Sequence, residues 1–303
     1  MSVLKSNLLL LLAAAIWGFA FVAQRVGMDY MGPFTFNGIR FVLGSMSLLP
    51  LIFYFRSRQQ PSATRATGAL LPGMLAGLIL FAGASLQQIG LLYTTAGKAA
   101  FVTCLYIVLV PIFGIFLKQR TGISTWLSSV LALVGLYLLC VKESFFISYG
   151  DLLQLIGAIF WTVHILLIDH FAERVDVLKL SCFQFMTCGI LSLVMALWQE
   201  TITIAGLAGG IVPILYGSFC SVGIAYTLQV VGQKYSPPAQ AAIILSMETV
   251  FATIGGFLLL DERLGFQELV GCALMLSGML LTQLQSIQPA VSGELVEQSE
   301  GKS

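Results

Sequence analysis

Two charged residues, Arg40 and Glu248, stand inside long apolar stretches of the sequence, well away from the ends of those stretches. A charge at the centre of a lipid bilayer costs at least about 2.5 kcal/mol, so such a residue usually faces a cavity or a partner. Arg40 could be the counter-ion of a carboxylate or phosphate ligand, or it could reach the interface or bond to local carbonyl groups for structural reasons. Glu248 could bind and release a proton, or it could form a protonated or hydrogen-bonded structural link between helices. Both alternatives stay open for each residue.

Neutral polar and aromatic side chains in the same apolar stretches are further candidates. His164 can titrate near neutral pH and could contact a ligand or carry a proton, although a buried histidine with a satisfied hydrogen bond is the more common case. Amide and hydroxyl groups offer neutral hydrogen bonds to a polar ligand. Tryptophan rings could form cavity walls or could pack between helices. The residues predicted to bind a ligand are Trp17, Asn37, Arg40, Gln87, Gln88, Tyr106, Trp161, His164, Tyr226 and Gln229, with Glu248 as the proton-binding group.

The sequence contains no motif of an enzyme or of a metal site. Walker loops, HExxH and GxSxG patterns and acidic loops for a divalent ion are all absent. The six cysteines lie in apolar stretches without a CxxC pair or metal-ligand spacing. We therefore expect no enzymatic activity, no catalytic residue, no metal and no cofactor. Without a nucleotide-binding loop, uphill movement of a solute would have to use an ion gradient or the downhill flux of another solute.

The elements that would position these residues are membrane-spanning helices. Of the 303 residues, 58% are hydrophobic and only 10% are charged, and the net charge of +1 gives no indication of a nucleic-acid partner. A bilayer core needs about 20 residues of helix. Charges and Gly or Pro punctuation then indicate an all-α membrane protein with ten transmembrane helices, over about Asn7–Val26, Pro33–Phe55, Gly68–Leu92, Ala96–Leu117, Ser124–Val141, Asp151–Phe171, Leu178–Trp198, Gly209–Val231, Pro238–Leu260 and Gln267–Gln285.

Cationic residues predict the orientation of these helices. Ten Lys or Arg residues fall on one set of loops and ends and four on the opposite set, and the richer side is expected in the cytoplasm. Both termini are therefore predicted to be cytoplasmic, in a multi-pass protein of the cell inner membrane. The first helix is expected to be retained, because apolar character continues beyond a short Ala-rich stretch that resembles a cleavage site. Residues 286–303 are rich in Ser, Gln, Glu and Gly and are predicted to be a disordered cytoplasmic tail.

An internal duplication relates the two halves of the chain. Trp17 matches Trp161 at an offset of 144 residues, and Gly135 matches Gly278 at an offset of 143. A longer pattern recurs at an offset of 142, as Gln87-xx-Gly90-xx-Tyr93-xxxxx-Ala99-Ala100 and Gln229-xx-Gly232-xx-Tyr235-xxxxx-Ala241-Ala242. Five helices in each half is an odd number, so the second half would enter the membrane from the opposite side. The predicted repeats are residues 1–143 and 144–285, and such inverted pairs typically alternate access around a central site.

Several segments, in this order and spacing, resemble the EamA-like family of the drug/metabolite transporter superfamily. The segments that carry the resemblance are Ile16-Trp17-Gly18, Phe34-Thr35-Phe36-Asn37-Gly38-Ile39-Arg40-Phe41, Gln88-Ile89-Gly90-Leu91-Leu92-Tyr93-Thr94-Thr95-Ala96, Ser246-Met247-Glu248-Thr249-Val250-Phe251 and Asp261-Glu262-Arg263-Leu264. The resemblance implies ten helices in an inverted repeat and secondary transport, often efflux, of small metabolites. In that family a proline usually follows the glutamate of the ninth helix. Here Thr249 stands in its place, so the resemblance alone does not establish a helix break at this point.

These observations together predict a secondary-active transporter that alternates access for small polar or amphipathic metabolites, such as amino acids or related solutes, and exports them. One alternative is a proton-coupled importer of a sugar or other metabolite, and another is a structural membrane protein that transports nothing. The expected partners are a small-molecule substrate, the lipid bilayer and protons as a candidate coupling ion, with the protein a monomer or a weak homodimer.

Overall fold

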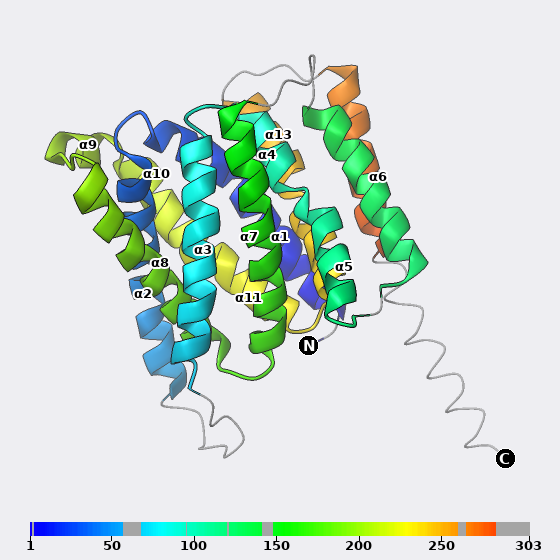
Figure 1. Ribbon diagram of the computed structural model, residues 1–303, viewed down its shortest axis with the longest axis horizontal. Helices are drawn as coiled ribbons and strands as arrows, with labels where there is room; N and C mark the ends of the chain where they lie inside the picture. Colours follow the sequence, from blue (N-terminus) through cyan, green and yellow to red (C-terminus); the bar gives the residue numbers. More distant parts are fainter. Residues whose placement is uncertain are drawn as a thin grey trace.

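The computed structural model describes residues 1, 3–56, 68–94, 96–119, 121–140, 148–259 and 265–282, and over these ranges the chain is helical without a strand (Figure 1). The elements are α1 (Val3–Gly27), α2 (Pro33–Arg56), α3 (Leu70–Gly90), α4 (Ala96–Thr103), α5 (Tyr106–Phe116), α6 (Ile123–Cys140), α7 (Tyr149–Ala172), α8 (Val177–Gln199), α9 (Ile204–Gly209), α10 (Ile211–Leu215), the π-helix η1 (Tyr216–Tyr226), α11 (Thr227–Gln233), α12 (Pro238–Leu245), α13 (Glu248–Leu259) and a further helix over Phe266–Thr282. The predicted disordered tail lies outside the described residues.

Within the described ranges, seven helical stretches are long and apolar enough to cross a membrane. They are Val3–Gly27, Pro33–Phe55, Leu70–Gly90, Tyr149–Ala172, Val177–Gln199, Ile211–Gln233 and Pro238–Gly255. Three of the other predicted ranges hold shorter apolar helices, over Tyr106–Phe116, Ile123–Leu138 and Phe266–Thr282. Many large apolar side chains on these helices are exposed, including Phe116, Leu197 and Trp198 at 81%, 77% and 79%. Such a surface suits lipid rather than water.

Two of the predicted helices are interrupted. The expectation of one continuous helix over Ala96–Leu117 is wrong, because α4 ends at Thr103 and α5 begins at Tyr106. The range Pro238–Leu260 is divided in the same way between Leu245 and Glu248, although no proline is present there. The ninth helix is therefore interrupted, although Thr249 stands where the family usually has proline. The Thr249 hydroxyl donates to the carbonyl of Ser246 at 2.9 Å, which supplies a local side-chain bond at the break.

Two backbone hydrogen bonds at the first interruption recur at the second, across the duplication. The amide of Leu105 bonds to the carbonyl of Val102 at 3.2 Å, and 142 residues later the amide of Met247 bonds to the carbonyl of Ile244 at 3.1 Å. The bond from Ile107 to Cys104 likewise recurs as the bond from Thr249 to Ser246, at 3.0 and 3.1 Å. These are bonds to the third preceding residue, which tighten the helix locally. Both halves thus contain the same break at the same place.

The eighth predicted range has a feature that breaks this likeness. Its middle, η1, is a π-helix of 11 residues, whereas the corresponding helix of the first half, α3, is a regular α-helix. Contacts with α1 hold the start and the middle of this segment. The Tyr216 hydroxyl donates to the carbonyl of Ile16 at 2.9 Å, and the Trp17 indole N–H donates to the carbonyl of Ser221 at 3.2 Å. π-helical turns frequently occur at functional sites.

Helices of the two halves pack against one another across the whole bundle. α3 packs against both α7 and α8, α2 packs against α8 and η1, and α1 packs against η1, α11 and α13. The helix Phe266–Thr282, orange to red in Figure 1, lies beside α6. There the two repeated glycines, Gly135 and Gly278, allow the helices to approach closely. A Cβ at Gly135 would lie 2.6 Å from the carbonyl oxygen of Gly271, and a Cβ at Gly278 would lie 2.9 Å from that of Ser128. The two sequence halves are therefore interleaved rather than side by side.

One carboxylate joins the start of α2 to the end of α8. Glu200 accepts from the amides of Phe34 and Thr35, both at 2.8 Å, and from the Thr35 hydroxyl at 2.7 Å. Glu200→Ala removes all three bonds, and losing hydrogen bonds to a charged acceptor costs about 1–3 kcal/mol. We expect the midpoint of thermal unfolding in detergent to fall by several degrees. Glu173→Ala, at an exposed carboxylate at the end of α7, is the control. An unchanged midpoint for Glu200→Ala would show that the link contributes nothing.

Candidate functional site

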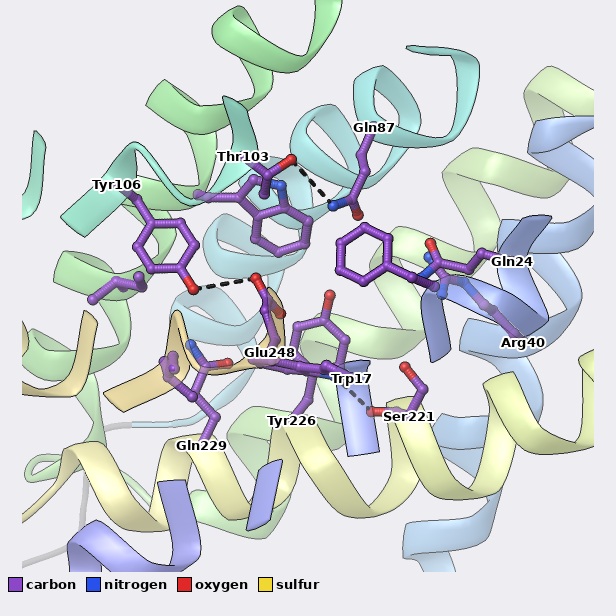
Figure 2. Close-up of a pocket in the computed structure, with 14 residues that line it drawn as sticks. Trp17, Gln24, Arg40, Gln87, Thr103, Tyr106, Ser221, Tyr226, Gln229 and Glu248 are labelled. Carbon is purple, nitrogen blue, oxygen red and sulfur yellow. Dashed lines mark hydrogen bonds between the residues drawn. The ribbon is translucent and has the colours of Figure 1, made fainter. Parts of the chain in front are cut away.

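A cavity lies between helices of both halves (Figure 2), and the open space in and around it, with the solvent at its mouth included, measures about 500 Å³. Helices α1, α3, α4 and α5 line it together with one residue of α2. From the second half, α7, η1, α11, α12 and α13 contribute the rest of the wall. The lining residues are Trp17, Phe21, Gln24, Arg40, Gln87, Thr103, Tyr106, Trp161, Ile165, Ser221, Tyr226, Gln229, Leu245 and Glu248.

Ten of these fourteen residues form pairs related by the duplication. At an offset of 144 residues the pairs join α1 to α7, and at 142 they join α3, α4 and α5 to α11, α12 and α13. Members of each pair thus stand at equivalent positions of the two halves and face the same cavity. The pairs are Trp17 with Trp161, Phe21 with Ile165, Gln87 with Gln229, Thr103 with Leu245, and Tyr106 with Glu248.

The two helix breaks meet at the Tyr106–Glu248 pair. The Tyr106 hydroxyl donates to Oε1 of Glu248 at 3.2 Å, and the Cys104 thiol donates to the same oxygen at 3.3 Å. Glu248 is buried, with 6% of its surface exposed, and it is the first residue of α13. Tyr106 is the first residue of α5. The carboxyl group therefore links the second half of each interrupted helix, and it does so at the cavity wall.

Aromatic rings form much of the remaining wall. The ring of Tyr226 lies 4.6 Å from that of Trp17 in an edge-on arrangement and 6.3 Å from that of Trp161 in a stacked one, measured between centroids. The two tryptophans differ in their hydrogen bonding. The Trp17 N–H bonds to Ser221 of the π-helix, whereas the Trp161 N–H has no partner among the described residues. The two repeats therefore differ in hydrogen bonding at this equivalent position.

Two amide oxygens at the cavity also lack partners. Oε1 of Gln24 and Oε1 of Gln229 accept no hydrogen bond within the described part of the chain, although both residues are at least nine-tenths buried. A buried acceptor without a partner is unfavourable unless water or a ligand supplies a donor. The cavity thus presents both donor and acceptor groups.

Arg40 contributes the only positive charge among the described lining residues. Its Nε donates to the side-chain oxygen of Asn37 at 3.0 Å, and its guanidinium carbon lies 5.3 and 4.9 Å from the ring centroids of Phe36 and Phe41. The residue is 2% exposed. Among the residues that the structure describes, no carboxylate lies within 4.0 Å of it. Figure 2 shows Arg40 and Gln24 on one side of the cavity and Tyr106 on the opposite side.

Three predicted residues do not line the cavity and instead form hydrogen bonds outside its wall. Asn37 accepts from Arg40 and donates to the carbonyl of Ala84 at 3.1 Å. Gln88 donates to the backbone carbonyl of Gln24 at 3.4 Å. His164 is fully buried, and its Nε2 donates to Gln184 at 2.9 Å. The other eight predicted residues, Trp17, Arg40, Gln87, Tyr106, Trp161, Tyr226, Gln229 and Glu248, all face the cavity.

Six lining residues fall outside the set predicted from the sequence. Four of them form the pairs Phe21 with Ile165 and Thr103 with Leu245, and the repeat offset could not find either pair because neither member was predicted. Gln24 shares a helical face with Trp17 but has an apolar counterpart. Ser221 faces the cavity from within the π-helix, which has no simple sequence signal. In the described ranges, no three His, Cys, Asp or Glu side chains come together as a metal site would require.

Known proteins resemble this chain over nearly its full length. The model of the EamA-like transporter family matches twice, over residues 4–141 and 148–284. An uncharacterized transporter of Archaeoglobus fulgidus is 31% identical over 283 residues, covering 93% of this chain and 87% of the relative. The uncharacterized transporter YoaV of Bacillus subtilis is 21% identical, covering 88% and 92%. A crystal structure of 18% identity has the same fold, with a TM-score of 0.78 over 94% of this chain and 98% of the other.

The double match agrees with the paired cavity residues and the paired helix breaks, and the apolar helices make the protein an integral, multi-pass membrane protein. The chain belongs to the EamA-like transporter family, and it is a membrane transporter built from two repeats.

Proposed function

We propose that the protein is a secondary-active transporter that moves small polar or amphipathic metabolites out of the cell across the cytoplasmic membrane. The observation that carries this proposal is the cavity, because equivalent residues of the two repeats line it in pairs. In this proposal the repeats are inverted, each with five spans, and both termini are cytoplasmic. Two similar bundles of opposite orientation can exchange conformations, so that a site between them opens alternately to either side.

The matched breaks supply a moving part for that exchange. A helix interrupted at mid-length can change the angle between its two segments, and both interrupted helices end their breaks at the Tyr106–Glu248 contact. In this mechanism α4 and α5 exchange conformations with α12 and α13 when the cavity opens to the other side. The contact between Tyr106 and Glu248 would then form or part with each cycle.

Proton-coupled import is a second candidate, favoured by the position of Glu248 on the cavity wall. Export by exchange for protons and import together with protons would both use this carboxyl group. The direction of an imposed pH gradient separates them in proteoliposomes. In import the solute accumulates on the side toward which protons flow, whereas in export by exchange it accumulates on the side from which they flow.

A cavity-filling substitution tests transport itself. Metabolite profiles of cells and medium, with and without the protein, identify the solute, and its flux is then measured in proteoliposomes. Ser221→Trp places an indole in the cavity and is expected to reduce that flux to the level of empty liposomes. Ser277→Trp, at an exposed position of the helix Phe266–Thr282, should retain at least half of it. A monodisperse elution profile shows that each variant is folded. Undiminished flux in a folded Ser221→Trp variant would contradict a pathway through this cavity.

A further inference from the structure

Four of the described lining residues have no cavity-lining equivalent in the other repeat, and they include the cavity's one cation. We call Gln24, Arg40, Ser221 and Tyr226 the Arg40 corner. In a duplicated structure, features shared by both halves suit the exchange of conformations. A feature found in one half alone suits recognition of a solute, because the solute itself has no matching symmetry. The equivalent positions carry Ile168, Gln184, Ile79 and Ala84, and none of these lines the cavity.

The described surroundings of Arg40 leave its charge without a counter-ion. Asn37 occupies one N–H of the guanidinium, and the rings of Phe36 and Phe41 lie close to the group. These neutral contacts hold the side chain in place without neutralising it. Gly217 of the π-helix provides the room it needs, since a Cβ there would lie 3.3 Å from Cδ of Arg40. On the same side of the cavity, the carboxamide oxygen of Gln24 has no partner in the described part of the chain, and as an acceptor it suits a donor group of the solute rather than the anion itself.

We propose that the Arg40 corner binds an oxyanion of the transported solute, a carboxylate, phosphate or sulfonate group, with Arg40 as its counter-ion. The proposal rests on the proposed transport function and gives its substrate a chemical class: a small organic anion or zwitterion with an apolar or aromatic body. The planar guanidinium can donate parallel hydrogen bonds to such a group. The body of the solute then lies against the rings of Trp17, Trp161 and Tyr226.

The energetics favour an occupied corner. A buried charge without a partner is strongly unfavourable, and an anion that pairs with it recovers part of that cost. The free oxygen of Gln229 and the carboxyl group of Glu248 lie elsewhere on the same wall and can accept hydrogen bonds from donor groups of the solute. A ligand with its anion at Arg40 and donors toward Gln229 would therefore satisfy groups that the described part of the protein leaves unpaired.

Binding in detergent tests the corner separately from transport. Two of the four tryptophans line the cavity, so bound ligand is expected to change the protein's fluorescence. The probes are phenylacetate, phenyl phosphate and the neutral phenylacetamide, at constant ionic strength in a non-ionic detergent. We expect at least one anion to bind ten times more tightly than the amide. Arg40→Gln should remove this preference and leave amide binding unchanged, whereas Arg40→Lys should keep part of it. The ratio of the dissociation constants of phenylacetate and phenyl phosphate indicates which oxyanion fits better.

Lys179→Gln is the matched control, because it removes an exposed positive charge outside the cavity. It should leave the preference for anions intact. The proposal is overturned if no anion binds more tightly than the amide, or if a folded Arg40→Gln protein keeps the preference. Solute flux in proteoliposomes is measured on the same preparations. Normal flux without anion preference would refute the corner and leave transport standing, whereas anion binding without any flux would refute transport and leave the corner standing.

Discussion

Proteoliposomes containing Glu248→Gln are expected to show no accumulation of solute in response to a pH gradient. One pH unit stores about 1.4 kcal/mol per proton, enough to concentrate a solute about tenfold when one proton is exchanged per cycle. Glutamine has nearly the same shape, and its carbonyl oxygen can still accept from Tyr106 and Cys104 as Oε1 of Glu248 does. It cannot bind and release a proton, so the expected accumulation falls from about tenfold to none while the structure is retained.

Two further measurements make this result specific. Exchange of labelled for unlabelled solute, which needs no gradient, should continue in Glu248→Gln, because the cavity keeps its shape. Glu173→Gln changes an exposed carboxylate at the end of α7 and should accumulate solute like the unmodified protein. If Glu248→Gln still concentrates solute fully in a pH gradient, Glu248 is a structural link and the coupling group lies elsewhere.

Gly18→Leu is expected to abolish transport altogether. α1 crosses α13 at this glycine so closely that a Cβ would lie 2.4 Å from Cβ of Phe251 and 2.7 Å from the carbonyl oxygen of Glu248. Two of the three nearest atoms belong to the backbone of α13, so no side-chain rotation can relieve the clash. Overpacking of a core costs about 1–3 kcal/mol even where side chains can adjust, and here a whole helix has to move. Since Trp17 and Glu248 flank the contact, that movement also distorts the cavity.

The matched control for this substitution is Gly68→Leu, where no described atom lies within 4 Å of the added Cβ. It should leave both the yield of monodisperse protein and the solute flux unchanged. For Gly18 a series of Ala and then Leu should show a graded fall in the thermal midpoint and in flux. Retention of more than about a tenth of the flux, a barrier change of under about 1.4 kcal/mol, in Gly18→Leu would mean that α1 and α13 are not closely packed in the working protein.

The positions of most helices could be predicted from the sequence, because polar residues bound the long apolar stretches. α7 and α8, for example, lie within two residues of their predicted limits at each end. The interruptions at 104–105 and 246–247 could not be predicted from local sequence, since neither contains proline or glycine. The π-helix could not be predicted either, because its first residue and its middle are bonded to Ile16 and Trp17, which come from a distant part of the chain.

The candidate site shows a similar division. Charge and aromatic character are sufficient to select Arg40, Glu248, Trp17 and Trp161, all of which face the cavity. Polarity alone cannot say on which side of a helix the cavity lies, and His164 accordingly bonds to Gln184 behind the wall. Pairing across the repeat does not replace this information, because both members of the apolar pair Phe21 and Ile165 were missed and became visible only in the structure.

The interleaving of the halves has a consequence for how the protein is made. α3 packs mainly against α7 and α8. These two helices leave the ribosome only after the entire first repeat has been synthesised. Until then the face of α3 that contains Gly77, which contacts the backbone of Gln184 in the folded protein, is exposed to lipid. A nascent chain halted midway would therefore lack the main contacts of α3, and each repeat produced separately would need the other to complete its core.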